Sequence, residues 1–131
     1  MGDEGLPAEQ PQVRELTAVE RGILEFVVST MSLGAAEARA QLSVAQHGGP
    51  AHPGTHVCFN IALPDDVPQI PQGESWPLLF DVDSSPEAPL TIDVFATDGR
   101  LSGIDLTTYG DDEVGLVWPE VSRIHRTANA S

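Results

Sequence analysis

A change of hydrophobic period near residue 50 constrains the fold of this chain more than any other feature. Before it, apolar residues recur at helical spacing in two segments, and after it they alternate with polar residues as in strands. Gly48-Gly49-Pro50 separates the two regimes and is expected to stop the second helix. A chain with its helices first and its strands afterwards is typical of an α+β protein with an antiparallel sheet.

The helical part divides into two segments. The first opens with Thr17 and Glu20 at capping-box spacing. Its expected inner face consists of Val19, Ile23, Phe26, Val27 and Thr30. The second segment is expected from Ala35 to Gln46. Its apolar stripe is thin and consists of Ala35, Ala38, Leu42 and Ala45.

Four alternating segments predict strands, at residues 56–63, 76–83, 90–96 and 100–108. Asp98-Gly99 lies between the last two, where both residues suit a two-residue type I′ turn, and Gly103 marks a slip of phase typical of a bulge. Residues 114–118 fit a further short strand, and residues 121–124 fit a strand or a helical turn. The expected fold is therefore two N-terminal helices packed on one face of a four- to five-stranded antiparallel meander sheet.

The length of 131 residues suits one domain. Residues 1–15 carry acidic residues and prolines without periodicity, so we expect a disordered acidic tail there. Residues 16–126 are expected to form a single α+β domain, and residues 127–131 a C-terminal tail.

Composition narrows the classes of partner. The chain has six basic residues, all of them arginine, and 20 acidic residues, which gives a formal net charge of -14. Such a charge repels phosphate backbones and anionic lipids, so we expect no nucleic acid and no membrane as partners, but a basic protein or a second copy. The N-terminus has no apolar signal core, which makes the cytoplasm the expected location.

The first candidate site is a row of aspartates on the sheet face away from the helices. Pairing about the 98–99 turn sets Asp93 across from Asp105, and a connection centred near residue 87 sets Asp81 across from Asp93. Like charges that face each other destabilise a sheet. Either a bound cation or basic partner explains the row, or solvent and salt screen it.

Leu79 and Phe95 are expected beside this row on the same outer face. Apolar side chains among carboxylates describe a protein-contact surface, for a basic partner or for self-association. The alternative is that the C-terminal segment covers them.

A second candidate site depends on pairing between segments 56–63 and 76–83. It would join His56 and Cys58 to Asp81 and Asp83, which are residue types that bind zinc, and Cys58 with a histidine would form a thiol–base pair. The spacing matches no CxxC or HExxH motif, and nucleophile-elbow and phosphate-loop motifs are also missing. No cofactor is therefore predicted, and a metal or thiol enzyme ranks below a binding function.

Three segments resemble a group of small, uncharacterised bacterial proteins. They are Leu16-Thr17-x-x-Glu20, the second helix around Arg39-Ala40-Gln41-Leu42, and Asp98-Gly99-Arg100-Leu101-Ser102. The resemblance covers most of residues 16–125 and implies no reaction, cofactor or catalytic residue. The leading hypothesis is thus a non-enzymatic protein-binding or accessory domain that uses the acidic sheet face, and a structural homodimer is a further alternative.

Overall fold

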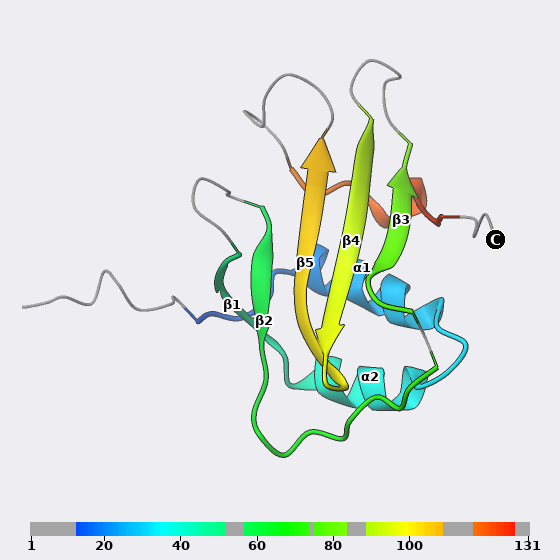
Figure 1. Ribbon diagram of the computed structural model, residues 1–131. Helices are drawn as coiled ribbons and strands as arrows, with labels where there is room; N and C mark the ends of the chain where they lie inside the picture. The colour runs from blue at the N-terminus through cyan, green and yellow to red at the C-terminus, as the bar shows by residue number, and fades with distance from the viewer. Residues whose placement is uncertain (1–12, 52–56, 74, 84–88, 109–116, 128–131) are drawn as a thin grey trace, which may run out of the picture.

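The computed structural model describes residues 13–51, 57–73, 75–83, 89–108 and 117–127. The elements in these residues are α1 (Ala18–Ser29), α2 (Ala35–Ser43), β1 (Gln46–Pro50), β2 (Phe59–Ala62), β3 (Leu78–Val82), β4 (Leu90–Thr97), β5 (Arg100–Thr108), η2 (Val121–Arg123, a 3-10 helix) and β6 (Ile124–Arg126). The strands form one antiparallel sheet in the order β1-β2-β5-β4-β3-β6 (Figure 1). The predicted α+β class with an antiparallel sheet is confirmed.

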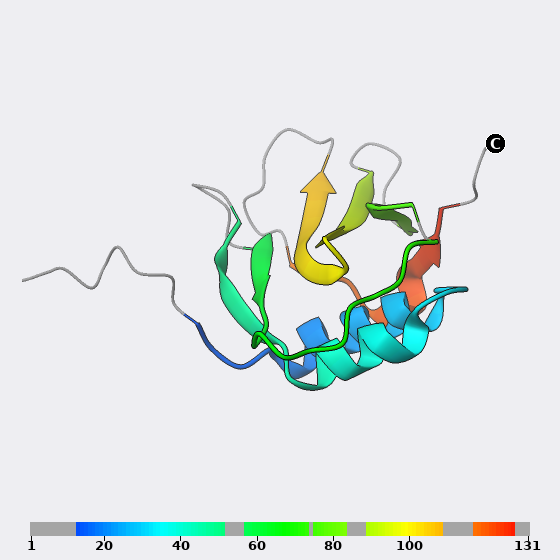
Figure 2. The ribbon, with the colours of Figure 1, turned by 60° about the horizontal axis from the view of Figure 1, so that its bottom comes forward.

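Both helices lie on the concave side of the curved sheet (Figure 2). The buried side chains form one hydrophobic cluster, to which α1, α2 and strands β2 to β6 contribute. Its largest members from the sheet are Phe59, Phe80, Leu78, Ile92, Ile104 and Leu106. Full burial of each such side chain contributes about 1.5–3 kcal/mol, so this cluster is the main source of stability.

Helix α1 begins where the sequence predicts. Thr17 Oγ1 accepts a hydrogen bond from the Glu20 N–H (3.1 Å), and Glu20 Oε1 accepts one from the Thr17 N–H (2.9 Å), so the capping box is formed. The inner face differs from the prediction, because Val19 is 53% exposed whereas Glu20 is buried. The buried residues of the helix after Glu20 are Ile23, Leu24, Val27 and Val28.

Helix α2 is shorter than predicted, because the residues interpreted as its stop belong to a strand. It ends at Ser43, and Gly48-Gly49-Pro50 lie in β1, which pairs with β2. Glycine suits position 48 because a Cβ atom there would lie 3.0 Å from the Asn60 carbonyl oxygen. The predicted inner residues Ala38, Leu42 and Ala45 are buried, and Ala35 is half-buried.

Strands β4 and β5 form the predicted hairpin. Asp98 (φ 54°) and Gly99 (φ 77°) both have the positive φ that a type I′ turn requires. Beyond the turn, the residues of β5 that pair with β4 skip from Leu101 to Gly103. The predicted bulge is therefore present, with Ser102 as its extra residue.

The predicted meander is wrong in strand number and in one connection. Strands β1 and β6 lie at the two edges, so the described residues contain six strands instead of four or five. The segment 121–124, for which the sequence allows a strand or a helical turn, contains both, because η2 ends at Arg123 and β6 begins at Ile124. The strand predicted at 114–118 lies largely outside the described residues. The crossover between β2 and β3, described at residues 63–73 and 75–77, passes to the far side of β4 (Figure 1), so β2 pairs with β5 and not with β3.

A buried amide holds this crossover in place. Gln41 on α2 is 0% exposed, and its Nε2 donates to the carbonyl oxygens of Pro68 (2.7 Å) and Gly99 (2.8 Å). Its Oε1 accepts a hydrogen bond from the Leu101 N–H (2.9 Å). One side chain therefore joins the second helix, the crossover and the β4–β5 hairpin, and its polar atoms have the partners that burial demands.

Candidate functional site

The sheet face turned away from the helices carries the predicted aspartates. We call its five central residues the outer acidic face: Leu79, Asp81, Asp93, Phe95 and Asp105. Because side chains alternate along a strand, these residues lie opposite the core residues of β3, β4 and β5. Leu79 is 47% exposed, Asp81 is exposed, and the other three are half-buried.

The register across this face confirms one predicted pair and corrects the other. Asp93 pairs directly with Asp105, as predicted. Its partner on β3 is Leu79, whereas Asp81 pairs with Thr91, so the predicted Asp81–Asp93 pair is wrong by two residues. A shift of two leaves Asp81 on the same face, because the side-chain period of a strand is two. Asp93 and Asp105 therefore form a facing pair across β4 and β5, and Asp81 on β3 lies diagonally from Asp93.

The facing pair is electrostatically unfavourable. Partial burial, and then the neighbouring Asp105 carboxylate, raise the pKa of Asp93 above its ordinary range. Among the described residues, Arg14 and Glu20 form an ion pair and His125 and Asp83 a hydrogen-bonded pair, and neither involves these two aspartates. Ionisation of both carboxylates thus costs stability, and a cation placed over the pair would remove that cost.

The arginines do not neutralise this face, because most of them bind the main chain. Four donate hydrogen bonds to carbonyl oxygens of other segments: Arg21, Arg100, Arg123 and Arg126. Arg14 pairs with Glu20 (3.0 Å), and Arg39 makes no hydrogen bond or ion pair within the described residues. The negative charge of the chain is therefore left largely to solvent or to a partner.

The second predicted site requires that β2 pairs with β3, and these strands are not neighbours in the sheet. Two strands, β5 and β4, separate β2 from β3, which places Cys58 about 14 Å from β3 at ordinary strand spacing. Cys58 is buried, where its Sγ accepts from the Leu106 N–H (3.4 Å) and donates to the Leu106 carbonyl oxygen (3.5 Å). Asp83 Oδ2 lies 3.0 Å from His125 Nε2. His56 lies outside the described residues, which contain no group of three potential metal ligands.

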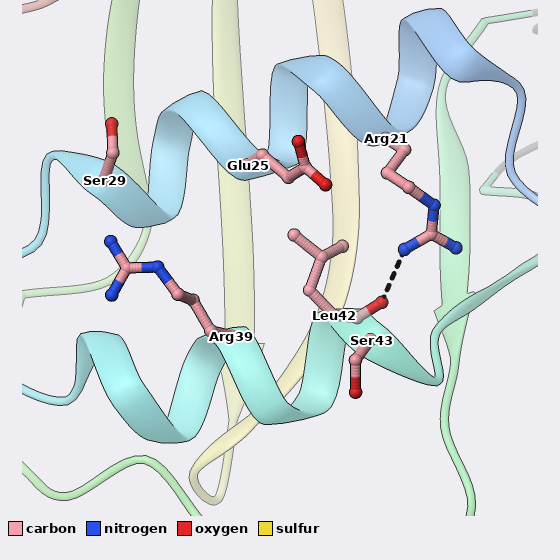
Figure 3. Close-up of a pocket in the computed structure, with 6 residues that line it drawn as sticks. All are labelled: Arg21, Glu25, Ser29, Arg39, Leu42 and Ser43. Carbon is pink, nitrogen blue, oxygen red and sulfur yellow. Dashed lines mark hydrogen bonds between the residues drawn. The ribbon is translucent and has the colours of Figure 1, made fainter.

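An open groove lies between α1 and α2, where the sequence predicts no site. It has a volume of about 390 Å³ and is lined by Arg21, Glu25, Ser29, Arg39, Leu42 and Ser43 (Figure 3). The Arg21 guanidinium is held by the Leu42 carbonyl oxygen (2.8 Å), and Glu25 projects between the helices. Its charged residues lie on solvent-facing helix positions, where the sequence pattern gives no signal. Their mixed charges select no particular ligand.

Neither described helix is long and apolar enough to cross a membrane. Comparison of the chain with family models, curated proteins and solved structures gives no match.

Proposed function

We propose that this protein is a non-enzymatic binding module that presents its outer acidic face to a basic protein partner. The observation that supports the proposal is the direct cross-strand pair of Asp93 and Asp105, beside the exposed side chain of Leu79. Repulsion between the two carboxylates disfavours the isolated sheet. A guanidinium or ammonium group from a partner would turn this repulsion into charge-assisted hydrogen bonds.

The distribution of charge supports the same partner class. A net charge of -14, with most arginines bound to the main chain, creates a negative potential that accelerates encounters with basic proteins. Leu79 and Phe95 add apolar area at the centre of the face, which is the composition of a contact surface whose charges set orientation. The module would therefore combine an apolar centre with carboxylates that align the partner.

The test is binding of an arginine-rich peptide and of a neutral peptide of equal length to the full chain, measured by calorimetry at low salt and at about 0.3 M salt. We expect the basic peptide alone to bind, and to bind more weakly in high salt. Asp93→Asn with Asp105→Asn should weaken binding, whereas Asp65→Asn with Asp66→Asn removes the same charge from exposed crossover positions and should not. Equal weakening by both pairs, or binding that is insensitive to salt, would refute a site on the outer acidic face.

A homodimer through the same face is the alternative, and the 47% exposure of Leu79 favours it. Two copies would bring their carboxylates together, so dimerisation should strengthen as the pH falls and the aspartates are protonated. Light scattering at increasing protein concentration measures this directly, and Phe95→Asp should dissociate such a dimer. A monomer at every concentration and pH would exclude the alternative.

A further inference from the structure

Far from the outer acidic face, the residues before α1 are held on edge strand β1. We call residues 13–16 the N-terminal arm. The Arg14 N–H donates to the His47 carbonyl oxygen (3.0 Å), and the His47 N–H donates to the Arg14 carbonyl oxygen (2.8 Å). The Arg14 guanidinium also binds both carboxylate oxygens of Glu20 on α1 (3.0 and 3.1 Å). The arm thus occupies an edge that would otherwise offer unpaired main-chain groups.

The side chain of His47 is fixed at the same point. Its ring stacks on the buried Phe59 ring, with centroids 4.4 Å apart and planes inclined by 19°. Its Nδ1 lies 3.1 Å from the Gly49 main-chain nitrogen and accepts a hydrogen bond from that N–H. Because an acceptor nitrogen carries no proton, this bond assigns the neutral tautomer with its proton on Nε2. A protonated ring has no acceptor left for the Gly49 N–H.

The surroundings of the ring also favour its neutral form. Burial, followed by the Arg14 guanidinium, lowers the pKa of His47, and the Glu20 carboxylate and a hydrogen bond to the main chain of His47 itself oppose this. Glu15, the acidic residue of the arm, accepts a hydrogen bond from Gln46 on β1 (3.2 Å). Strand β2 presents the apolar Phe59 to the ring. A proton on His47 would therefore add a second positive charge beside Arg14 in a partly desolvated position.

We propose that His47 is a pH-sensitive latch, which holds the N-terminal arm on β1 when neutral and releases it when protonated. Release would free the main-chain N–H and C=O of His47 and the N–H of Gly49 at the sheet edge. An antiparallel extended segment can pair with such groups. The latch therefore makes access to the β1 edge depend on proton concentration.

The pH range of the latch follows from the directions in which the pKa values of His47 and Glu20 are shifted. Because the pKa of His47 is lower in the folded than in the unfolded state, the contribution of the latch is complete above the unfolded value of about 6.5 and is lost as the pH falls below it. Burial by itself would raise the pKa of Glu20, but its bonds with Arg14 and Thr17 lower it overall. Protonation of Glu20 therefore needs stronger acid, so a change in the arm over the range in which His47 titrates belongs to His47 and not to Glu20.

The test follows the full-length chain by NMR from about pH 7.5 to about pH 5, the range in which histidine titrates. It records the shift of the His47 ring and the exchange protection of the Arg14 and His47 amides, corrected for intrinsic exchange. We expect protection of both amides to fall about fivefold, as loss of one hydrogen bond implies, with the same midpoint as the ring. Amides that stay protected while the ring titrates, or that open at an unrelated pH, would overturn the proposal.

Two variants sharpen this test. His47→Phe keeps an aromatic ring on Phe59 but cannot titrate, so protection of the Arg14 amide should become independent of pH over the same range. His125→Phe is the matched control, because His125 is an exposed histidine on β6 at the opposite edge of the sheet, and it should leave the pH dependence intact. Persistent pH dependence in His47→Phe contradicts the latch. If that variant does not fold, agreement between ring and amide midpoints in the unaltered chain decides.

Discussion

Replacement of Gln41 by leucine tests the claim that one amide holds the crossover. Leucine is close to glutamine in volume, so the substitution leaves no large cavity and removes only the polar contacts. The Leu101 N–H loses its partner inside the protein, whereas the Pro68 carbonyl oxygen belongs to an exposed residue and can bond water instead. The Gly99 carbonyl oxygen keeps a hydrogen bond from the Ile70 N–H (2.8 Å). The expected loss therefore comes mainly from the buried Leu101 N–H.

A buried main-chain group that loses its partner costs about 1–3 kcal/mol, so Gln41→Leu should lower the free energy of unfolding by about 2 kcal/mol. For a chain of this size the loss corresponds to a fall in Tm of about 6–10 °C. Urea unfolding followed by circular dichroism measures it, provided that the slope against urea concentration is unchanged.

Gln69→Leu is the matched control for this substitution. Gln69 is exposed on the same crossover, and its amide donates one longer hydrogen bond to the Asp98 carbonyl oxygen (3.3 Å). Removal of such an exposed contact should cost less than about 0.5 kcal/mol. If Gln41→Leu costs no more than this control, the crossover does not depend on the buried amide, and the reasoning fails.

Two further predictions concern stability. Asp93→Asn should stabilise the protein by about 0.5 kcal/mol at neutral pH, because it removes the repulsion by Asp105. Since the pKa of Asp93 is raised in the folded state, its ionisation costs stability above the unfolded pKa, and the gain should vanish in acid; an equal gain at both pH values in urea unfolding would contradict this. Gly22→Ala should stabilise α1 by about 1 kcal/mol, because nothing lies within 4 Å of its Cβ position. Gly99→Ala should instead destabilise by about 2 kcal/mol, because φ is +77° and the Cβ atom would lie 2.9 Å from the Ile70 carbonyl oxygen; thermal melts that show the same sign for both would refute the argument.

Local sequence signals predicted the structure correctly where residues that are close in the sequence are also close in space. The capping box of Thr17 and Glu20 depends on residues three apart, and it is present. The Asp98-Gly99 turn fixes the pairing of the strands on either side, so the facing pair of Asp93 and Asp105 was predicted correctly. The face of Asp81 was also correct although its register was not, because a shift of two residues conserves the face.

Errors arose where distant segments determine the structure. Gly48-Gly49-Pro50 has the composition of a helix stop, but pairing with β2 makes it a strand. The order of strands was wrong because the bonds of Gln41 to Pro68 and Leu101 join residues far apart in the sequence. The N-terminal arm was missed because nothing in the sequence of residues 1–15 indicates that Arg14 pairs with His47.

The position of Gln41 also has a consequence for the order of events during synthesis. Helix α2 leaves the ribosome well before the side chain of Gln41 can form its hydrogen bonds within the protein. Leu101, whose N–H donates to Gln41 Oε1, lies 60 residues further along the chain. At a translation rate of about 5–20 residues per second, Leu101 is synthesised roughly 3–12 s after Gln41. Until the β4–β5 hairpin has been synthesised, α2 carries the polar amide of Gln41 on its inner face. Water therefore competes for the hydrogen bonds that this amide later forms with the protein.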